Sequence, residues 1–303
     1  GRLTGRAESF REERTMPRTS VITLTHNKLP VTRRCLSGWL ETEEDDWEII
    51  VVDNGSTDGT REWLGEFADK AEERGVNVRR IFNPDNVGCS TARNMGIQAA
   101  RGDYLVFADN DVTVRTRSWL QRLRAALDAD AARGIVGPKL VYPYAPFPIQ
   151  CAGAAVSPSG RVQFRGRGEP RDDPRFNRPC EVQCLISACF MFKRAVADRI
   201  GGLDEVFNPV EYEDLDFCYR ARESGFEVHY EPSVEMYHFE SVTTAGTASL
   251  PNTYLIIKHG MLFKERWRHM FEQENGPPDE ATRWRTMPAV DFAAIGPLPL
   301  DSA

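Results

Sequence analysis

The sequence predicts an α/β fold in which a mostly parallel central sheet carries helices on both faces. Short runs rich in β-branched and aromatic residues alternate with amphipathic helical patterns, at a spacing of roughly 30 residues that is typical of βαβ units. A chain of 303 residues with 41% hydrophobic and 27% charged residues has the composition of a globular protein. Its length suits one large domain or two modest ones.

Four strands are predicted in the first part of the chain from short apolar runs that end at turn residues. They cover residues 20–25, 47–52, 76–82 and 104–108. Amphipathic helices are predicted between them, after Pro30, through Trp63 and over 90–100. Because the carboxyl ends of parallel strands meet at the same edge of a sheet, the residues that follow these strands are expected to share one crevice.

Polar residues follow all four predicted strands. They are His26-Asn27, Asp53-Asn54, Asn86–Gly88 and Asp109–Asp111. A D-x-D pair alone is weak evidence for a site, since aspartates also cap turns and helices. Together, the four polar strand ends favour a nucleotide-phosphate site in which Asp109 and Asp111 offer hard oxygen ligands to Mg²⁺ or Mn²⁺.

The second part of the chain is predicted to be less regular. A helix is expected over 118–127, short strands over 134–137, 226–230 and 234–237, and a buried strand over 182–192. The Pro, Gly and Arg residues of 138–179 predict an irregular excursion with a β-hairpin around 156–162.

A basic run within that excursion has two open interpretations. Its members are Arg161, Arg165, Arg167 and Arg171. Guanidinium groups suit donor phosphates or an anionic acceptor. A solvated surface loop explains the same residues equally well.

Five motifs, in this order, carry a resemblance to a known family. They read VITLTHN, VVDNGSTDGT, NVGCSTARNMGI, FADND and EYEDLDFCYR. Together they resemble family 2 glycosyltransferases with the GT-A fold, over about residues 20–241. The resemblance implies a Rossmann-like GT-A domain over 19–241, with a nucleotide-binding half over 19–115 and an acceptor and catalytic half over 116–241.

The activity that this resemblance implies is an inverting, metal-dependent sugar transfer. The donor would be a nucleotide-diphosphate sugar, with UDP expected first and dTDP next. The acceptor would be a hydroxyl or another nucleophile on a glycan, a lipid-linked saccharide, a natural product or a peptide.

In enzymes of this family the donor lies against the strand ends described above. The resemblance assigns the pyrimidine ring to Asp53 and places His26 and Arg93 near the nucleotide. His26 stands where an aromatic Tyr is usual, which leaves the stacking of the base unassigned. The residues expected to bind the donor are Thr25, His26, Asn27, Asp53, Asn86, Arg93, Asp109 and Asn110.

The resemblance also implies a cation site and a base. Asp111 is the expected direct ligand of Mn²⁺ or Mg²⁺, with Asp109 beside it and His238 completing the shell. An imidazole among oxygen ligands suits Mn²⁺ somewhat better. The base that takes the proton from the acceptor would be Asp214, with Glu213 as the alternative.

Two other functions stay open. A non-catalytic protein that binds sugar nucleotides, or a scaffold, could use the same fold, although every acid that the chemistry needs is present. Nucleotidyl transfer is less favoured, because Thr25-His26-Asn27-Lys28 is not the Gly-rich phosphate loop that this chemistry would want after the first strand.

Charge and hydropathy limit the partners. A net charge of −7 argues against a general nucleic-acid binder. No apolar run reaches the roughly 18 residues of a membrane span, and the first residues lack a signal-peptide core. We therefore expect a cytoplasmic protein, either free or peripheral at the inner face of the membrane.

Both ends of the sequence are expected to lie outside the predicted domain. Residues 1–18 are charged and aperiodic, as in a disordered arm or a remnant of cloning. Residues 242–303 are expected to hold a loop that closes over the donor (243–249), an amphipathic helix (252–271) and a Pro-rich end. The helix either packs against the catalytic domain or attaches peripherally to a membrane.

The cysteines are expected to be reduced. The chain has seven of them, an odd number, and the closest cluster lacks the paired C-x₂-C spacing of a structural zinc site. Most lie in apolar segments, where a buried thiol behaves as a small hydrophobic side chain.

Overall fold

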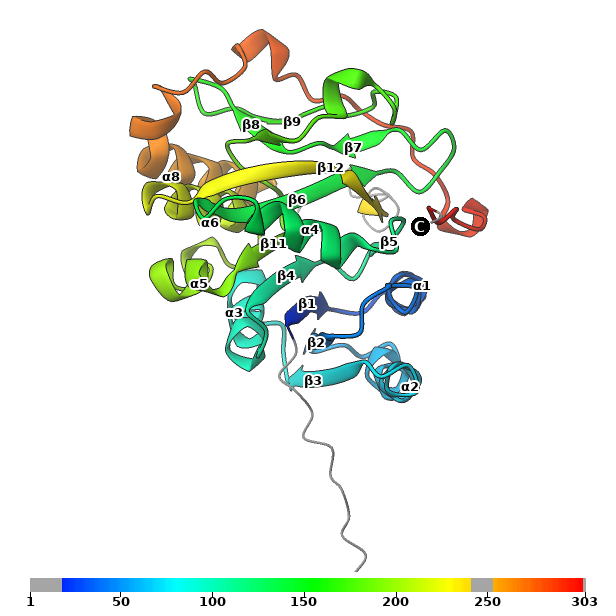
Figure 1. Ribbon diagram of the computed structural model, residues 1–303. Coiled ribbons are helices and arrows are strands. Elements are labelled where there is room, and N and C mark those ends of the chain that lie inside the picture. Colours follow the sequence, from blue (N-terminus) through cyan, green and yellow to red (C-terminus); the bar gives the residue numbers. More distant parts are fainter. Residues whose placement is uncertain (1–17, 241–252, 302–303) are drawn as a thin grey trace, which may run out of the picture.

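The computed structural model describes residues 18–240 and 253–301. Within these residues, a sheet of ten strands runs through the molecule and carries helices on both faces (Figure 1). The predicted α/β class is therefore confirmed. Of the predicted N-terminal arm, only Arg18 is described, and the predicted closing loop at 243–249 lies outside the described residues.

The N-terminal half alternates strands and helices as predicted. Its strands pair in parallel in the order β4-β1-β2-β3, and they are β1 (Thr19–Thr25), β2 (Trp47–Asn54), β3 (Asn77–Asn83) and β4 (Tyr104–Ala108). The helices between them are α1 (Leu29–Trp39), α2 (Thr60–Glu72) and α3 (Cys89–Ala99).

The second half extends the same sheet in the order β10-β12-β6-β11 as far as β4, with β5 paired to β12 and β7 paired to β6. Its strands are β5 (Val112–Val114), β6 (Arg133–Val141), β7 (Ile149–Cys151), β10 (Cys180–Glu181), β11 (Cys189–Lys193) and β12 (Glu227–His238). β8 (Ala154–Val156) and β9 (Val162–Phe164) form a separate hairpin, as predicted. The helices are α4 (Trp119–Asp128), α5 (Arg194–Ile200), α6 (Glu213–Glu223) and α8 (Thr253–Phe271).

Short 3₁₀ turns complete the described residues. They lie at Pro174–Phe176, Glu205–Phe207, Asp279–Ala281 and Phe292–Ala294. The sheet is parallel throughout its N-terminal half, whereas β11 runs antiparallel to both of its neighbours, β4 and β6.

The prediction of one buried strand over 182–192 was wrong. The structure has β10 before this range and β11 from Cys189, with an irregular segment between them. Two backbone N–H groups of this segment bond to side chains of α6: Leu185 donates to Cys218 Sγ and Ser187 donates to Asp214 Oδ2. Cys184 and Leu185 pack in the same core as α6, whereas Ile186 and Ala188 pack in the core on the opposite face of the sheet. Burial alone does not distinguish such a segment from a strand.

Two further strand predictions were wrong in extent. The strand predicted at 134–137 continues through Pro138 to Val141, so the irregular excursion begins later than expected. The two strands predicted at 226–230 and 234–237 are one strand, β12, whose pairing with β6 shifts between Glu231 and Glu235. Such a bulge bends a strand without ending it.

Alternate residues of the central strands enter two separate cores. Ile22, Ile50 and Val52 pack with α3, α5, α6 and α8. Val21 and Ile49 face the other way and pack with α1, α2 and α4. Because side chains alternate along a strand, strands that are apolar at nearly every position must be covered on both faces.

Helix α8 packs against the rest of the domain, as the first interpretation of the amphipathic pattern predicted. Phe263, Trp267 and Phe271 are buried in the same core as α6. Trp267 Nε1 donates to the fully buried Asp216 at 2.9 Å, and Arg266 forms an ion pair with the same carboxylate at 2.7 Å. In the part of the chain that the structure describes, no helix is long and apolar enough to cross a membrane.

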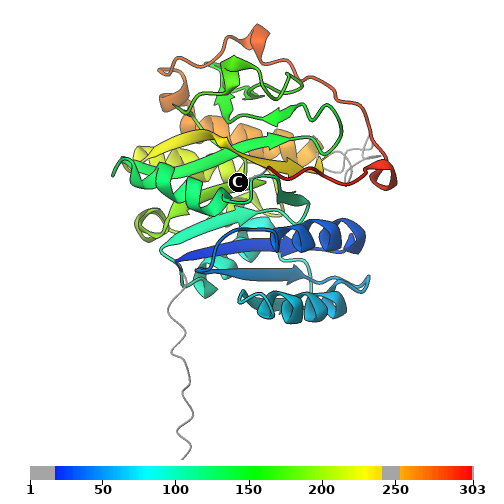
Figure 2. The same ribbon diagram turned by 45° about the vertical axis from the view of Figure 1, so that its right-hand side comes forward.

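The residues after α8, 272–301, are called here the C-terminal segment. In Figures 1 and 2 this segment (orange to red) passes over the β8-β9 hairpin and then returns toward the N-terminal half. Arg34 donates to the carbonyl oxygen of Ile295 at 2.8 Å, and Arg115 forms an ion pair with Asp301 at 3.1 Å. The last residues of the Pro-rich end are therefore fixed against the rest of the molecule.

All seven cysteines lie among the described residues and are free thiols. Five of them are buried. The expectation of reduced cysteines is consistent with this arrangement.

Gly88 is required by the turn that leads into α3. Its φ is 88° and its ψ is 166°, a region that is essentially restricted to glycine. A Cβ atom at this position would also come within 2.4 Å of Asn208 Oδ1. Asn208 Oδ1 accepts from Ser90 N, so this contact connects the start of α3 to the loop before α6.

We predict that Gly88→Ala lowers the free energy of unfolding by about 1–3 kcal/mol, because the backbone strain and the clash act together. Chemical denaturation measures the change. Gly75→Ala is the matched control, since Gly75 also has a positive φ (78°) but has open space around its Cβ position. An equal loss in both variants would mean that the contact with Asn208 contributes nothing.

Candidate active site

A cavity of about 1140 Å³ lies at the carboxyl edge of the parallel strands. It is lined by the ends of β1, β4 and β12, the first residues of α3 and α6, and parts of the hairpin, α8 and the C-terminal segment. All the residues predicted to bind donor, bind metal or act as the base line this cavity except Asn27 and Asp53. Ten side chains that are dispersed in sequence from 25 to 238 are thus brought together.

The turn after β1 presents Thr25 and His26 to the cavity. Asn27 and Lys28 both adopt left-handed backbone conformations, with φ of 58° and 60°, which reverses the chain before α1. His26 Nδ1 donates to the carbonyl oxygen of Asn54 at 2.6 Å. Asn27 Oδ1 accepts from Thr57 N at 2.8 Å, so this amide braces the turn.

Asp53 is held away from the cavity. Its carboxylate is fully buried and accepts from Thr25 Oγ1, Ser56 N and Arg61 Nε, the last at 2.6 Å. Burial opposes the charged form, but these hydrogen bonds outweigh it and lower the pKa of Asp53. Its role in recognising a pyrimidine stays a prediction, and its neighbour Asn54 is the residue that lines the cavity.

Two further residues that are predicted to bind the sugar donor, Asn86 and Asn110, line the cavity and form hydrogen bonds within the protein. Asn86 Oδ1 accepts from Gly88 N at 2.9 Å, which shapes the loop before α3. Asn110, between the two aspartates, donates to Thr32 Oγ1 at 2.7 Å. Both side chains are thereby oriented by the protein itself.

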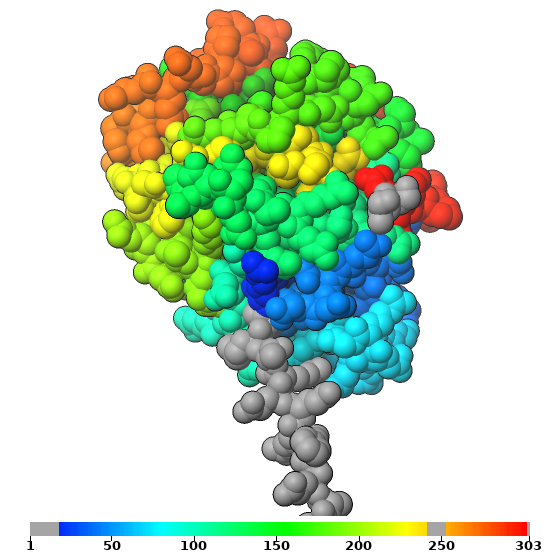
Figure 3. Space-filling view, viewed as in Figure 1, coloured from blue at the N-terminus to red at the C-terminus, as the bar shows by residue number. Residues whose placement is uncertain are grey.

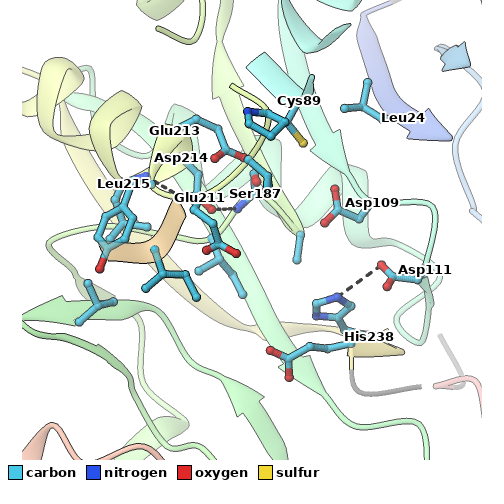
Figure 4. A pocket seen from close by; sticks show the side chains of 18 of the residues that line it. Leu24, Cys89, Asp109, Asp111, Ser187, Glu211, Glu213, Asp214, Leu215 and His238 are labelled. Carbon is cyan, nitrogen blue, oxygen red and sulfur yellow. Dashed lines mark hydrogen bonds and ion pairs between the residues drawn. The ribbon is translucent and has the colours of Figure 1, made fainter. Parts of the chain in front are cut away.

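Asp109, Asp111 and His238 form a cluster that could hold a metal ion. One ligand atom from each lies within 4.8 Å of the others. The register of the sheet explains why His238 lies near the aspartates, since His238 ends β12 opposite Val112, the residue after Asp111. His238 Nε2 lies 3.4 Å from Asp111 Oδ1, and Figure 4 shows the ring facing both aspartates.

Gln150, which was not predicted, orients the histidine. Its Oε1 accepts from His238 Nδ1 at 3.2 Å, so the lone pair of the neutral imidazole lies on Nε2, toward the aspartates. Such an outer hydrogen bond commonly fixes the ring of a metal-binding histidine. Gln150 lies on β7, 88 residues away in sequence, and no motif marked it.

Arg93 connects the two acidic motifs. Its side chain is 4% exposed and lies between Asp109 Oδ1, at 2.7 Å, and Glu213 Oε1, at 2.9 Å. The charges of these acids raise the pKa of Arg93 despite its burial, so the guanidinium is always charged. Arg93 lines the cavity, and its predicted contact with donor stays a prediction.

Glu213 and Asp214 begin α6. The two residues before them, Glu211 and Tyr212, have φ of 86° and 71°, a strained pair that turns the chain into the helix. Asp214 accepts from Ser187 N and from Leu215 N, each at 2.8 Å. Figure 4 shows the Glu213 and Asp214 side chains across the cavity from Asp109 and Asp111.

Three acids of the site have a pKa above that of an ordinary carboxylic acid. Burial raises the pKa of Asp109 and of Asp214. Burial and the nearby Asp214 raise the pKa of Glu213 to about 7. For His238, burial disfavours the charged form, but the adjacent Asp111 outweighs it and raises the pKa.

Three of the four arginines in the basic run form contacts within the protein, and the fourth lines the cavity. Arg167 pairs with Glu240 at 3.1 Å and Arg171 pairs with Glu235 at 2.9 Å. Arg165 donates to the carbonyl oxygen of Ala152 at 3.1 Å. Of the four arginines, Arg161 alone lines the cavity.

The far wall of the cavity was not anticipated. It includes Ile256 and Lys264 from α8, and Thr282 and Trp284 from the C-terminal segment. Amphipathic spacing predicted that α8 would pack on the domain, but it could not indicate which part of the domain. The approach of the C-terminal segment had no signal in the sequence.

Comparison with known proteins agrees with the fold and identifies the family. The model of the family described as Glycosyl transferase family 2 matches residues 20–201. The uncharacterized protein y4gI of Sinorhizobium fredii is 30% identical over 258 residues, which make up 83% of this chain and 28% of that protein. The chain therefore spans under a third of that relative's length.

Solved structures support the same conclusion. Mannosyltransferase PcManGT from Pyrobaculum calidifontis, in complex with GDP-Man and Mn²⁺, has a TM-score of 0.56 at 21% identity, covering 85% of this chain and 71% of that one. GalNAc-T7 with UDP, GalNAc and Mn²⁺ has a TM-score of 0.60 at 18% identity, covering 74% and 43%. At these identities the likeness shows the fold, and the family match, which covers more than half of the chain, shows that it belongs to glycosyltransferase family 2, on a GT-A fold.

Proposed function

We propose that this protein transfers a sugar from a nucleotide-diphosphate sugar to a nucleophile of an acceptor, in a single displacement that inverts the anomeric centre. The observation that carries the proposal is the arrangement of the cavity. The Asp-Asp-His cluster lies on one side, and Glu213 and Asp214 lie on the other (Figure 4). Such a cavity separates the place for a diphosphate from the place for a nucleophile.

The residues present fit a divalent cation. Asp109 and Asp111 offer carboxylate oxygens, and His238 offers the Nε2 lone pair that its bond to Gln150 leaves available. This donor set suits Mn²⁺ somewhat better than Mg²⁺. A cation held there would offset the negative charge of the diphosphate leaving group.

Asp214 is the best candidate for the base. Two backbone N–H groups fix its carboxylate at the cavity wall, and burial raises its pKa, which increases its basicity. It would accept the proton of the acceptor hydroxyl as that oxygen attacks the anomeric carbon. Glu213 is the weaker candidate, because Arg93 already holds one of its oxygens and the residue is 3% exposed.

The donor is expected to carry a pyrimidine base. UDP is our first expectation and dTDP the second, from the family resemblance. Among the structural neighbours, GalNAc-T7 was solved with UDP and PcManGT with GDP-Man. Thr25, His26 and Asn54 line the cavity, and we expect them to select among these bases.

A non-catalytic sugar-nucleotide binder is the alternative function. It would need the donor pocket and would not need Asp214 in its present position. Consumption of donor in the presence of acceptor or water distinguishes the two functions.

We expect Asp214→Asn to abolish transfer while leaving donor binding unchanged, because the amide keeps the shape but accepts no proton. The loss in kcat should be about 10²–10⁴-fold, the usual contribution of a general base. Product formation and donor affinity are measured separately. Retained transfer in this variant would disprove the assignment of the base.

We expect one nucleotide-diphosphate sugar to raise the melting temperature, and to do so only with Mn²⁺ or Mg²⁺ present, since a ligand that binds the folded state stabilises it. The panel is the UDP, dTDP, GDP and CMP sugars, and a chelator should reverse the shift. Asp111→Ala should remove the cation-dependent part. A full shift in the chelated protein would contradict the proposed metal site.

Glu213 should make the protein less stable as pH rises. Its pKa is raised from 4.5 to about 7 in the folded state, so its stabilising contribution is present below the unfolded value and is lost as pH rises through about 7. Between about pH 5 and pH 8, the melting temperature of the wild type should therefore fall relative to that of Glu213→Gln. Parallel curves for the two proteins would show that Glu213 does not titrate in this range.

A further inference from the structure

A second, smaller groove of about 260 Å³ lies next to the active-site cavity. The two share Val162, Phe164, Thr282 and Trp284 in their walls. The groove lies between the β8-β9 hairpin, the segment around Phe176 and the C-terminal segment. Figure 3 shows these parts, green and orange, in contact at the end of the molecule opposite α2 and β3.

Trp284 is the central feature of this groove. It is 57% exposed, although large aromatic side chains are usually covered. The guanidinium of Arg167 lies 3.8 Å from the centre of its ring, and Phe164 packs edge-on at 5.3 Å. Trp284 is therefore held in place by both neighbours while much of its surface remains accessible.

Four arginines and one glutamate line the groove. Arg167 is neutralised by Glu240, and Glu169 is shared between Arg175, at 2.9 Å, and Arg285, at 3.0 Å. Arg175 also pairs with Asp173 at 2.7 Å. The four arginines thus face three carboxylates, which leaves one positive charge in excess beside the exposed Arg283, on a chain whose net charge is −7.

We propose that this groove binds the acceptor beyond its reacting sugar, and that the acceptor is a saccharide chain carrying negative charge. The proposal rests on the proposed function, because an acceptor subsite has meaning only beside a transferring site. An exposed indole face suits the C–H face of a pyranose ring. Arginine forks suit carboxylate or phosphate groups on that chain.

The position of the groove next to the cavity favours a linear chain as the occupant. A chain whose end lies at Asp214 would leave the cavity past Phe164 and Trp284, which belong to both walls. The overall acidity of the protein disfavours general binding of polyanions, since their attraction depends on long-range positive charge. Recognition therefore depends on the saccharide and its charges together.

Tryptophan fluorescence gives a selective measurement of this groove. All six tryptophans lie in the described part of the chain, and the five other than Trp284 are at most 5% exposed. Quenching by acrylamide should therefore report mainly on Trp284. The probes are oligogalacturonate, which carries carboxylates, neutral malto-oligosaccharide of equal length, and oligothymidylate as a non-saccharide polyanion.

The proposal predicts that oligogalacturonate protects Trp284 from acrylamide and that the other two probes do not. Arg283→Ser with Arg285→Ser should weaken this binding by about tenfold or more, and so should high salt. Arg33→Ser with Arg74→Ser is the control, because these arginines are equally exposed at 58% and 55% but lie on the far half. No protection, equal protection by the neutral chain or by oligothymidylate, or equal weakening in the control, would overturn the proposal.

The test is independent of catalysis. It needs neither donor nor cation, and Asp111→Ala should bind oligogalacturonate as the wild type does. Arg283 and Arg285 do not line the active-site cavity, so hydrolysis of donor by water should be unchanged in their double variant. Binding without transfer would leave a site for anionic saccharides but overturn the proposed function and, with it, the acceptor role of the groove. Transfer without binding would overturn the groove alone.

Discussion

The buried guanidinium of Arg93 is the interaction on which the site depends. It forms ion pairs with Asp109, at the end of β4, and with Glu213, at the start of α6. Glu213 lies 120 residues after Arg93 in the sequence. It also lies over the ring of Phe107, 5.4 Å from the ring centre. Because a buried cation is tolerated only when it is paired, removing both acids would leave an uncompensated charge in the core. The two acidic motifs are therefore constrained to keep one relative position.

Different parts of the sheet position the metal cluster and the candidate base around this contact. β4 and β5 bring the aspartates, and pairing of β12 with β5 brings His238 opposite Val112. The irregular segment before β11 leaves the sheet and donates Ser187 N to Asp214. The segment between β10 and β11, which is not part of a regular strand, thus holds the carboxylate of the candidate base Asp214 in place.

Local patterns could predict most of the N-terminal half, because each strand there ends in polar residues and each helix has an apolar face. The metal cluster followed from motif spacing and from the family resemblance. Gln150, the burial of Asp53 and the course of 182–188 could not be predicted, since each depends on partners distant in sequence. The bulge in β12 could not be predicted from the sequence either, because a break in apolar alternation within one strand looks the same as a turn between two strands. Long-range pairing, rather than local preference, decided these features.

The family match ends at residue 201, whereas Asp214, His238 and the walls supplied by α8 and the C-terminal segment come later. The family model therefore does not cover the candidate base, one member of the metal cluster, or the walls from α8 and the C-terminal segment. Substitutions in α8 and the C-terminal segment can change those walls without altering β1 to β4. If these walls bind the acceptor as proposed, a lineage could acquire new acceptors through changes there, while the strand ends and the Asp-Asp-His cluster that would hold the donor stay the same.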